Sequence, residues 1–100
     1  MQPLDLLILN AACDDWENLA SIRESVASAP QGDPVESYEL EACLLRLVRE
    51  KRLEAHEFVN GTFVPLPSDS VDASTVANLW FFITAEGRRV LDENSSFFEQ

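Results

Sequence analysis

The stretch LWFFITAEGRRVL, residues 79–91, predicts a strand that leads directly into a helix. Residues 75–83 are rich in β-branched and aromatic side chains, which is typical of a strand. Thr84 is suited to cap the following helix, and Glu86 places a negative charge in its first turn, where the helix dipole favours it. Val90 and Leu91 would supply the apolar contacts of this helix.

Two short extended runs, residues 57–59 and 62–64, precede this strand and are separated by Asn60-Gly61. Asn-Gly between two such runs is a strong hairpin signal, because both central positions of the turn need a positive φ. Residues 65–74 are polar and contain many turn formers, which predicts a loop. We therefore expect a β-hairpin, a loop and a returning strand in this half of the chain.

Three helical patterns precede the hairpin. The first covers residues 3–13, with apolar side chains at the spacing of one helix face. The second is expected over residues 14–30, capped by its first aspartate and with Trp16 on its buried face, and a turn is expected at residues 31–34. The third, over residues 35–51, has the clearest amphipathic spacing.

The composition is typical of one small globular domain that covers residues 1–100. Hydrophobic residues make up 46% and charged residues 25% of the chain. Two cysteines are too few for a disulfide framework, which favours reduced thiols and a cytoplasmic location. The apolar run at residues 6–9 is far shorter than the roughly 20 residues that span a bilayer, so neither export nor membrane insertion is indicated.

The chain is strongly acidic. It has 18 acidic and 7 basic residues, which give a formal net charge of -11. Such a charge repels nucleic acids and anionic membranes at long range. Only residues 46–52 are locally basic, and a patch of this kind can still act on a partner within a Debye length of about 10 Å.

The order of these predicted elements, three helices, a hairpin with a loop, a strand and a helix, resembles that of winged helix-turn-helix domains. Residues 44–54, LLRLVREKRLE, resemble the third helix of such domains and the strand that follows it. Residues 79–91 are similar to the aromatic strand and helix start of the PadR (phenolic-acid-decarboxylase regulator) and MarR (multiple-antibiotic-resistance repressor) families. The resemblance implies an α+β winged-helix fold of a transcription-regulator type, whose third helix enters the DNA major groove and whose hairpin forms a wing.

The positions that match the DNA-reading half of the third helix are acidic here. Residues 35–41 contain Glu36, Glu39 and Glu41, and the wing, residues 57–76, contains no Lys or Arg. Each carboxylate would oppose the counterion release that dominates affinity for DNA. We therefore expect a module that works through protein contacts. The alternative is a regulator that binds double-stranded DNA directly through Arg46, Arg49, Lys51, Arg52, Arg88 and Arg89.

These cations also have a simpler structural interpretation. Basic residues at the end of a helix complement its dipole, and the cluster at residues 46–52 can pair with Glu39, Glu50 or Glu54. Arg88 and Arg89 are expected to pair with Asp92 or Glu93 on the same helix.

The sequence has no pattern that indicates catalysis or metal binding. His56, Cys13 and Cys43 lack the CxxC or paired-histidine spacing of a metal site. The carboxylates at residues 14–17 and 36–41 do not follow the calcium-loop pattern, and there is no phosphate loop or nucleophile elbow. We expect a protein that is not an enzyme and has no metal or cofactor.

Aromatic residues provide the candidate interaction surface. Trp80, Phe81 and Phe82 are consecutive in a predicted strand, where alternate side chains face opposite sides, so either Phe81 or both of its neighbours must leave the core. Phe97 and Phe98 add further apolar surface. This surplus predicts a homodimer or a protein partner, with these five residues as the candidate interface.

Overall fold

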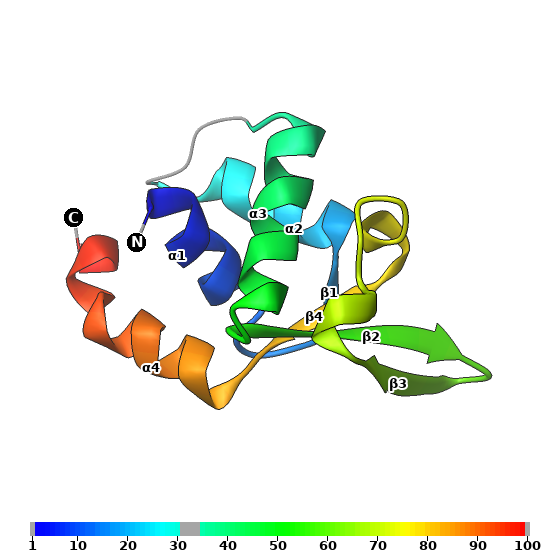
Figure 1. The fold of residues 1–100 in the computed structure, drawn as a ribbon. Helices are drawn as coiled ribbons and strands as arrows, with labels where there is room; N and C mark the ends of the chain where they lie inside the picture. The colour runs from blue at the N-terminus through cyan, green and yellow to red at the C-terminus, as the bar shows by residue number, and fades with distance from the viewer. Residues whose placement is uncertain (1, 31–34, 100) are drawn as a thin grey trace.

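The computed structural model describes residues 2–30 and 35–99. Over these ranges it has four α-helices and one four-stranded antiparallel sheet, an α+β arrangement (Figure 1). The helices are α1 (Pro3–Ala11), α2 (Leu19–Ser28), α3 (Ser37–Arg49) and α4 (Ala85–Glu93). The strands are β1 (Glu17–Asn18), β2 (Leu53–Val59), β3 (Thr62–Leu66) and β4 (Trp80–Ile83), and short 3-10 helices cover Ser68–Ser70, Val76–Asn78 and Ser95–Glu99.

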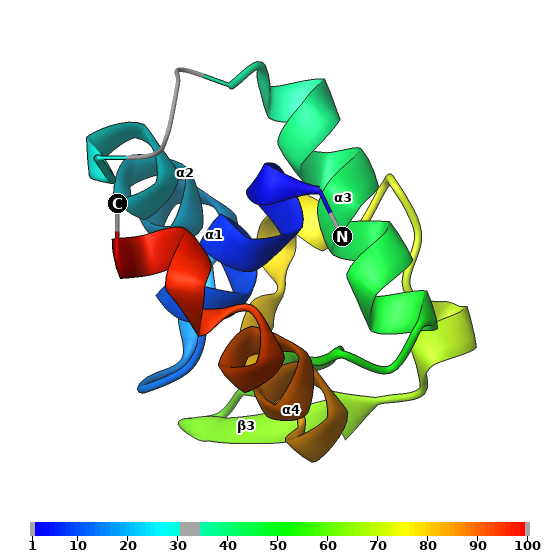
Figure 2. The same cartoon turned by 90° about the vertical axis from the view of Figure 1, so that its left-hand side faces the viewer.

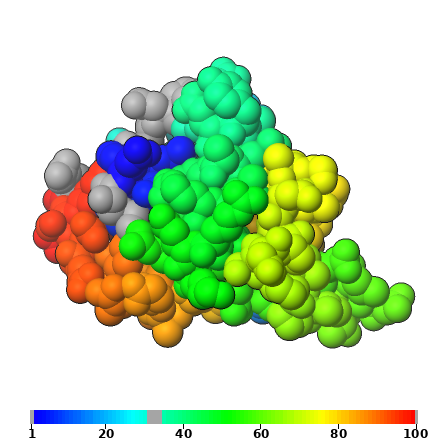
Figure 3. Space-filling view, in the orientation of Figure 1, coloured from blue at the N-terminus to red at the C-terminus, as the bar shows by residue number. Residues whose placement is uncertain are grey.

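The strand order in the sheet is β1-β4-β2-β3. β2 and β3 form the predicted hairpin, and Asn60 and Gly61 at its turn have φ values of 50° and 79°. Pro65 lies in β3, an edge strand, where the missing N–H can face away from the ladder. The tip of this hairpin projects from the body of the protein (Figure 3).

The helices α1, α2 and α3 lie on one side of the sheet (Figure 1), and Figure 2 shows α1 seated between α2 and α3. α4 lies at the end of the sheet, directly after β4. The core fills the space between the helices and the sheet. Its largest fully buried side chains include Phe81, Ile8, Leu9, Ile22, Leu40, Leu44, Leu47 and Leu53.

The prediction for residues 14–18 was wrong. Glu17 and Asn18 form the edge strand β1, which pairs with Phe81 and Trp80 of β4. α2 begins only at Leu19, because the Asn18 side chain accepts a hydrogen bond from the Ser21 N–H at 2.9 Å and so caps the helix. Ladder bonds to a strand some 60 residues away in sequence therefore outweigh the local capping signal at residues 14–17.

Smaller differences occur at other boundaries. The returning strand covers only Trp80–Ile83, since Val76–Asn78 forms a 3-10 helix whose Val76 side chain is fully buried. α3 begins two residues later and ends two residues earlier than the sequence predicts. The turn predicted at residues 31–34 lies outside the described residues.

Candidate interaction surface

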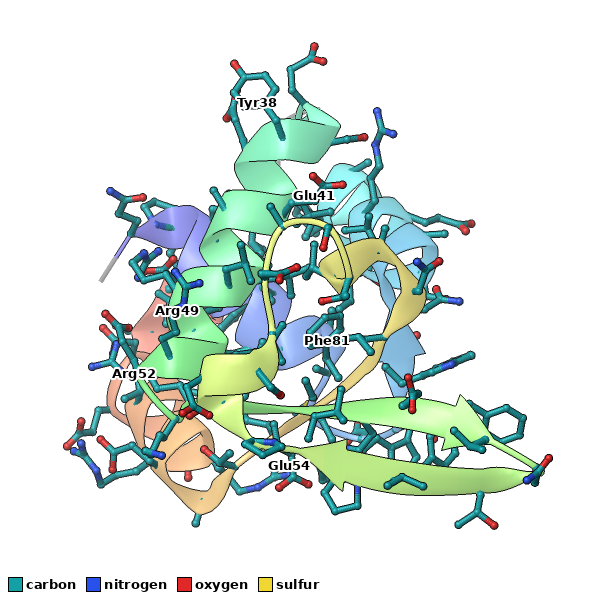
Figure 4. All side chains as sticks on the ribbon, turned by 45° about the vertical axis from the view of Figure 1, so that its right-hand side comes forward. Tyr38, Glu41, Arg49, Arg52, Glu54 and Phe81 are labelled. Atoms are coloured by element: carbon teal, nitrogen blue, oxygen red, sulfur yellow. The ribbon has the colours of Figure 1, made fainter. Side chains whose placement is uncertain are left out.

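Alternation along the strands divides the sheet into a helix-facing side and an outer side. Trp80 of β4 pairs with His56 of β2, and Phe82 pairs with Glu54, so these side chains share the outer side. Figure 4 shows Phe81 on the side of the helices and Glu54 on the opposite side. We call the side that carries Glu54 the outer sheet face.

Six aromatic side chains contact one another on the outer sheet face. The Trp16 ring stacks on Phe63, with centroids 4.8 Å apart and an interplanar angle of 12°. It also meets the edge of His56 at 4.1 Å and lies 5.1 Å from Phe82. Phe63 in turn lies 5.0 Å from Phe58 and 5.7 Å from Trp80. We call this group the aromatic cluster; its members are Trp16, His56, Phe58, Phe63, Trp80 and Phe82.

The aromatic cluster remains partly open to solvent. Phe58 is 53% exposed, and Trp16, Phe63, Trp80 and Phe82 are half-buried. Since large apolar side chains in contact on a surface commonly mark an interface, this cluster is the strongest candidate interaction site in the described part of the chain.

His56 is the polar member of the cluster and is buried, with 6% of its surface exposed. Its Nδ1 atom has no hydrogen-bond partner among the described residues, and its Nε2 atom lies 3.9 Å from the Glu54 carboxylate. Burial lowers the pKa of His56, although the Glu54 charge acts in the opposite direction. The imidazole is therefore neutral at neutral pH, as its aromatic surroundings favour.

The structure separates the aromatic residues that the sequence proposed for an interface. Phe81 points into the core and is fully buried, so its assignment to an interface was wrong. Its neighbours Trp80 and Phe82 are half-buried on the outer sheet face, because strand side chains alternate, and Phe82 also packs against the edge of the core. Phe97 and Phe98 contact each other edge to face at 5.0 Å and pack, partly buried, against the protein's own core.

Sequence reasoning missed Trp16, His56, Phe58 and Phe63 as parts of this surface. A signal for two of them was present, since a two-residue Asn-Gly turn fixes the register of the hairpin and makes Phe58 and Phe63 direct partners. No local pattern indicates that Trp16 joins them, because β1 is positioned by its pairing with β4.

The surroundings of the aromatic cluster are acidic. Residues 53–87 contain no Lys or Arg. Glu54 shares the outer sheet face, with 49% of its side chain exposed. The exposed carboxylates of Asp14 and Asp15 precede Trp16, and Asp15 Oδ1 accepts a hydrogen bond from the Trp16 N–H at 2.8 Å.

Arg46, the first of the candidate DNA contacts, forms a mostly buried network with Asp5 and Cys43. Its guanidinium pairs with the Asp5 carboxylate, whose side chain is only 3% exposed, and also lies 3.5 Å from Glu50. The Cys43 thiol donates a hydrogen bond to Asp5 Oδ1 at 2.8 Å. Burial raises the pKa of Asp5, but the hydrogen bonds and charge of Arg46, with the bond from Cys43, outweigh it and leave the pKa lowered.

The other five candidate cations also contact groups of the protein itself. Arg52 lies 3.6 Å from Glu50, Arg88 donates to the Cys13 carbonyl at 2.7 Å, and Arg89 pairs with Glu86 and Glu93. Arg49 donates to the Val71 carbonyl at 3.5 Å, and Lys51 to the Ser68 hydroxyl at 3.4 Å.

These cations do not form one continuous patch. Arg46, Arg52 and Arg89 line an open groove that also contains the carboxylates of Asp5 and Glu93. Arg49 and Lys51 instead contact residues 68–71, and Arg88 reaches Cys13, two residues beyond the end of α1. The expected pairing with Glu93 is made by Arg89, while the contact of Arg88 with Cys13 was not foreseen.

The first turns of α3 present acidic and aromatic side chains. Tyr38 is 68% exposed, and Glu36 and Glu39 are exposed beside it. Figure 4 shows Tyr38 at the end of α3 that lies farthest from the sheet. Leu40 on the opposite side of this helix is fully buried, so the exposed stripe is the part that a ligand could reach.

Two further observations apply to residues 2–30 and 35–99. No three His, Cys, Asp or Glu side chains gather there in a group that could hold a metal ion. None of the helices in these ranges has the length and apolarity needed to cross a membrane.

Comparisons with protein-family models, with curated proteins and with solved structures give no match. The resemblance to winged-helix regulators therefore stays a prediction that rests on residues 44–54, residues 79–91 and the order of elements.

Proposed function

We propose that this chain is a non-catalytic winged-helix module that acts through contacts with protein. The observation that carries the proposal is the aromatic cluster, five of whose six side chains are partly or largely exposed on a sheet face that α1, α2 and α3 leave uncovered. Apolar surface of this kind is a liability in a monomer and is normally covered by a partner.

The order of elements supports the winged-helix assignment. α2 and α3 correspond to the helix pair of such a domain, and the projecting β2–β3 hairpin corresponds to its wing. Thr84 and Gly87, which belong to the stretch that carries the resemblance, lie at the start of α4 and form a hydrogen bond across its first turn.

The charges favour protein contacts over DNA. In a winged helix the first turns of α3 would face the major groove, where Glu36 and Glu39 would meet phosphate charges. Of the two arginines in α3, Arg46 neutralises the buried Asp5, and Arg49 makes a longer contact of 3.5 Å to the Val71 carbonyl. A DNA complex would have to break such contacts before it gained phosphate contacts.

Fluorescence anisotropy with a labelled mixed-sequence duplex, titrated from low to physiological salt, tests this proposal. We expect no binding in the micromolar range at any salt concentration, because the acidic surface repels the duplex. Light scattering after size exclusion of the same sample then distinguishes a monomer that awaits a partner from a homodimer.

Tight binding that weakens steeply with salt would instead support the DNA-binding alternative. In that case an Arg49→Ala, Lys51→Ala variant should lose the binding, since both residues are exposed and only weakly engaged. Arg46 is unsuitable for this purpose because its loss would leave Asp5 buried without a counter-ion.

A further inference from the structure

We propose that the outer sheet face binds an arginine-rich segment of a partner protein, with the aromatic cluster as platform and Glu54 as counter-ion. This inference rests on the proposed function, because it names the chemistry of the partner for the same surface.

The charge of the surface selects a cationic partner. Glu54 lies on the outer sheet face, and Asp14 and Asp15 lie beside Trp16. Arg88, which donates to the Cys13 carbonyl, offsets part of the charge of Asp14, and residues 53–87 supply no further Lys or Arg. With a formal net charge of -11, the remainder of the chain adds to the attraction. Complementary charge of this kind speeds association and excludes acidic partners.

The aromatic rings supply the second part of the recognition. A guanidinium or ammonium group over the face of Trp or Phe is attracted by the ring quadrupole, and the effect is strongest for Trp. Trp16 and Trp80 both belong to the cluster, and Phe58 is its most exposed ring. Arginine also stacks flat on such rings, so it suits this surface better than lysine does.

Other occupants fit the surface less well. A second copy of the chain would bring its own Glu54, Asp14 and Asp15 into the same contact, and like charges there would repel. Single-stranded nucleic acid can stack its bases on aromatic side chains, but its phosphates need a positively charged groove. The four strands carry no Lys or Arg to form one.

Intrinsic tryptophan fluorescence tests the proposal directly, because Trp16 and Trp80 are the two tryptophans of the chain. The probe is a short peptide of alternating arginine and glycine, which has no fluorescence of its own, added at physiological salt. We expect a saturable change in tryptophan emission. The matching lysine peptide should bind more weakly, and the matching glutamate peptide should cause no change.

Matched variants locate the site. Phe58→Ala and Glu54→Gln should each weaken binding of the arginine peptide by about fivefold, the size expected for one exposed cation–π or charge contact. Tyr38→Ala and Glu39→Gln remove a more exposed aromatic ring and the same charge from α3, far from the sheet, and should leave the affinity within about twofold of wild type. Circular dichroism establishes that each variant is folded.

The inference would be overturned by unchanged tryptophan emission, by equal binding of the arginine and lysine peptides, or by equal weakening by the sheet and α3 variants. The last two would mean that net charge alone attracts the peptide. An oligothymidine that changes the emission would indicate nucleic acid as the ligand, and dimers that compete with the peptide would indicate a second copy. None of these results requires duplex binding, which is the separate test of the proposed function.

Discussion

The Thr84 hydroxyl donates a hydrogen bond to the Lys51 carbonyl, 2.7 Å away, and so joins the end of α3 to the start of α4. The same oxygen accepts the Gly87 N–H at 3.0 Å and caps α4. The Thr84 N–H donates to the Arg52 carbonyl at 3.1 Å. These three bonds hold the first turn of α4 close against the turn between α3 and β2.

Gly87 is required by this close approach. A Cβ atom at position 87 would lie 2.1 Å from the Arg52 carbonyl oxygen and 2.9 Å from a side-chain carbon of Ile83. Gly87→Ala would gain about 1 kcal/mol of helix propensity in an open helix. Here we expect it to lower the free energy of unfolding by about 2 kcal/mol, because backbone must move. Urea unfolding measures the difference.

Gly61→Ala is the control for that variant. Gly61 has a φ of 79°, but nothing lies within 4 Å of the added methyl group, so only the backbone strain of about 1 kcal/mol is expected. A Gly87→Ala protein at least as stable as wild type would show that α4 does not pack this closely.

The Arg46–Asp5 pair should contribute more to stability than any surface pair. Arg46→Ala leaves the buried Asp5 carboxylate without its main partner, and we expect a loss of about 2 kcal/mol, less than for a fully buried pair because the Arg46 side chain is 41% exposed. Arg89→Ala removes exposed pairs and should cost under about 0.5 kcal/mol. Equal losses in the two variants would contradict the special role of Asp5.

Acid should erase the effect of Arg46→Ala. The pKa of Asp5 is held below its ordinary value of 3.8 in the folded protein, so its contribution is complete above that pH and is lost as the pH falls through the lower, folded value. The difference between wild type and variant in chemical unfolding should therefore shrink at acidic pH. A difference that is constant across this range would assign the effect to packing of the arginine stem.

His56 should make stability depend on pH in a different range. Burial lowers its pKa below 6.5, so the unfolded chain takes up a proton first as the pH falls. As the pH is lowered from 6.5 to the pKa of the folded protein, the free energy of unfolding should therefore decrease. Above pH 6.5 this group should not affect it. His56→Phe should remove this part of the pH dependence in urea titrations, and a slope identical to wild type would argue against it.

Lys51 occupies a position that favours glycine. Its φ is 62°, and the chain there closes α3 with bonds from the Lys51 N–H to the Val48 carbonyl at 3.0 Å and from the Arg52 N–H to the Leu47 carbonyl at 2.9 Å. Lys51→Gly should raise the free energy of unfolding by about 1 kcal/mol. Lys51→Ala removes the same side chain without relieving the backbone, and a similar gain there would refute this explanation.

Several local features of the fold follow from the sequence alone. Asn60-Gly61 specifies the hairpin turn because its two positive φ values suit few other residue pairs. Thr84 caps α4 as its position predicts, and the apolar spacing of α3 forms a buried face that includes Leu44 and Leu47. In each case the deciding interactions join residues that are close in sequence.

The candidate site depends on contacts between distant segments. Residues 14–18 have an acceptable local pattern for a helix start, yet pairing with β4 makes Glu17–Asn18 a strand and brings Trp16 against Phe63 and His56. Strand geometry predicts that Phe81 faces one side of the sheet and that Trp80 and Phe82 face the other, but it does not predict which side is buried. Only the side on which the helices pack decides which of these rings is buried, because one face of the sheet must close the core and the other is left to solvent.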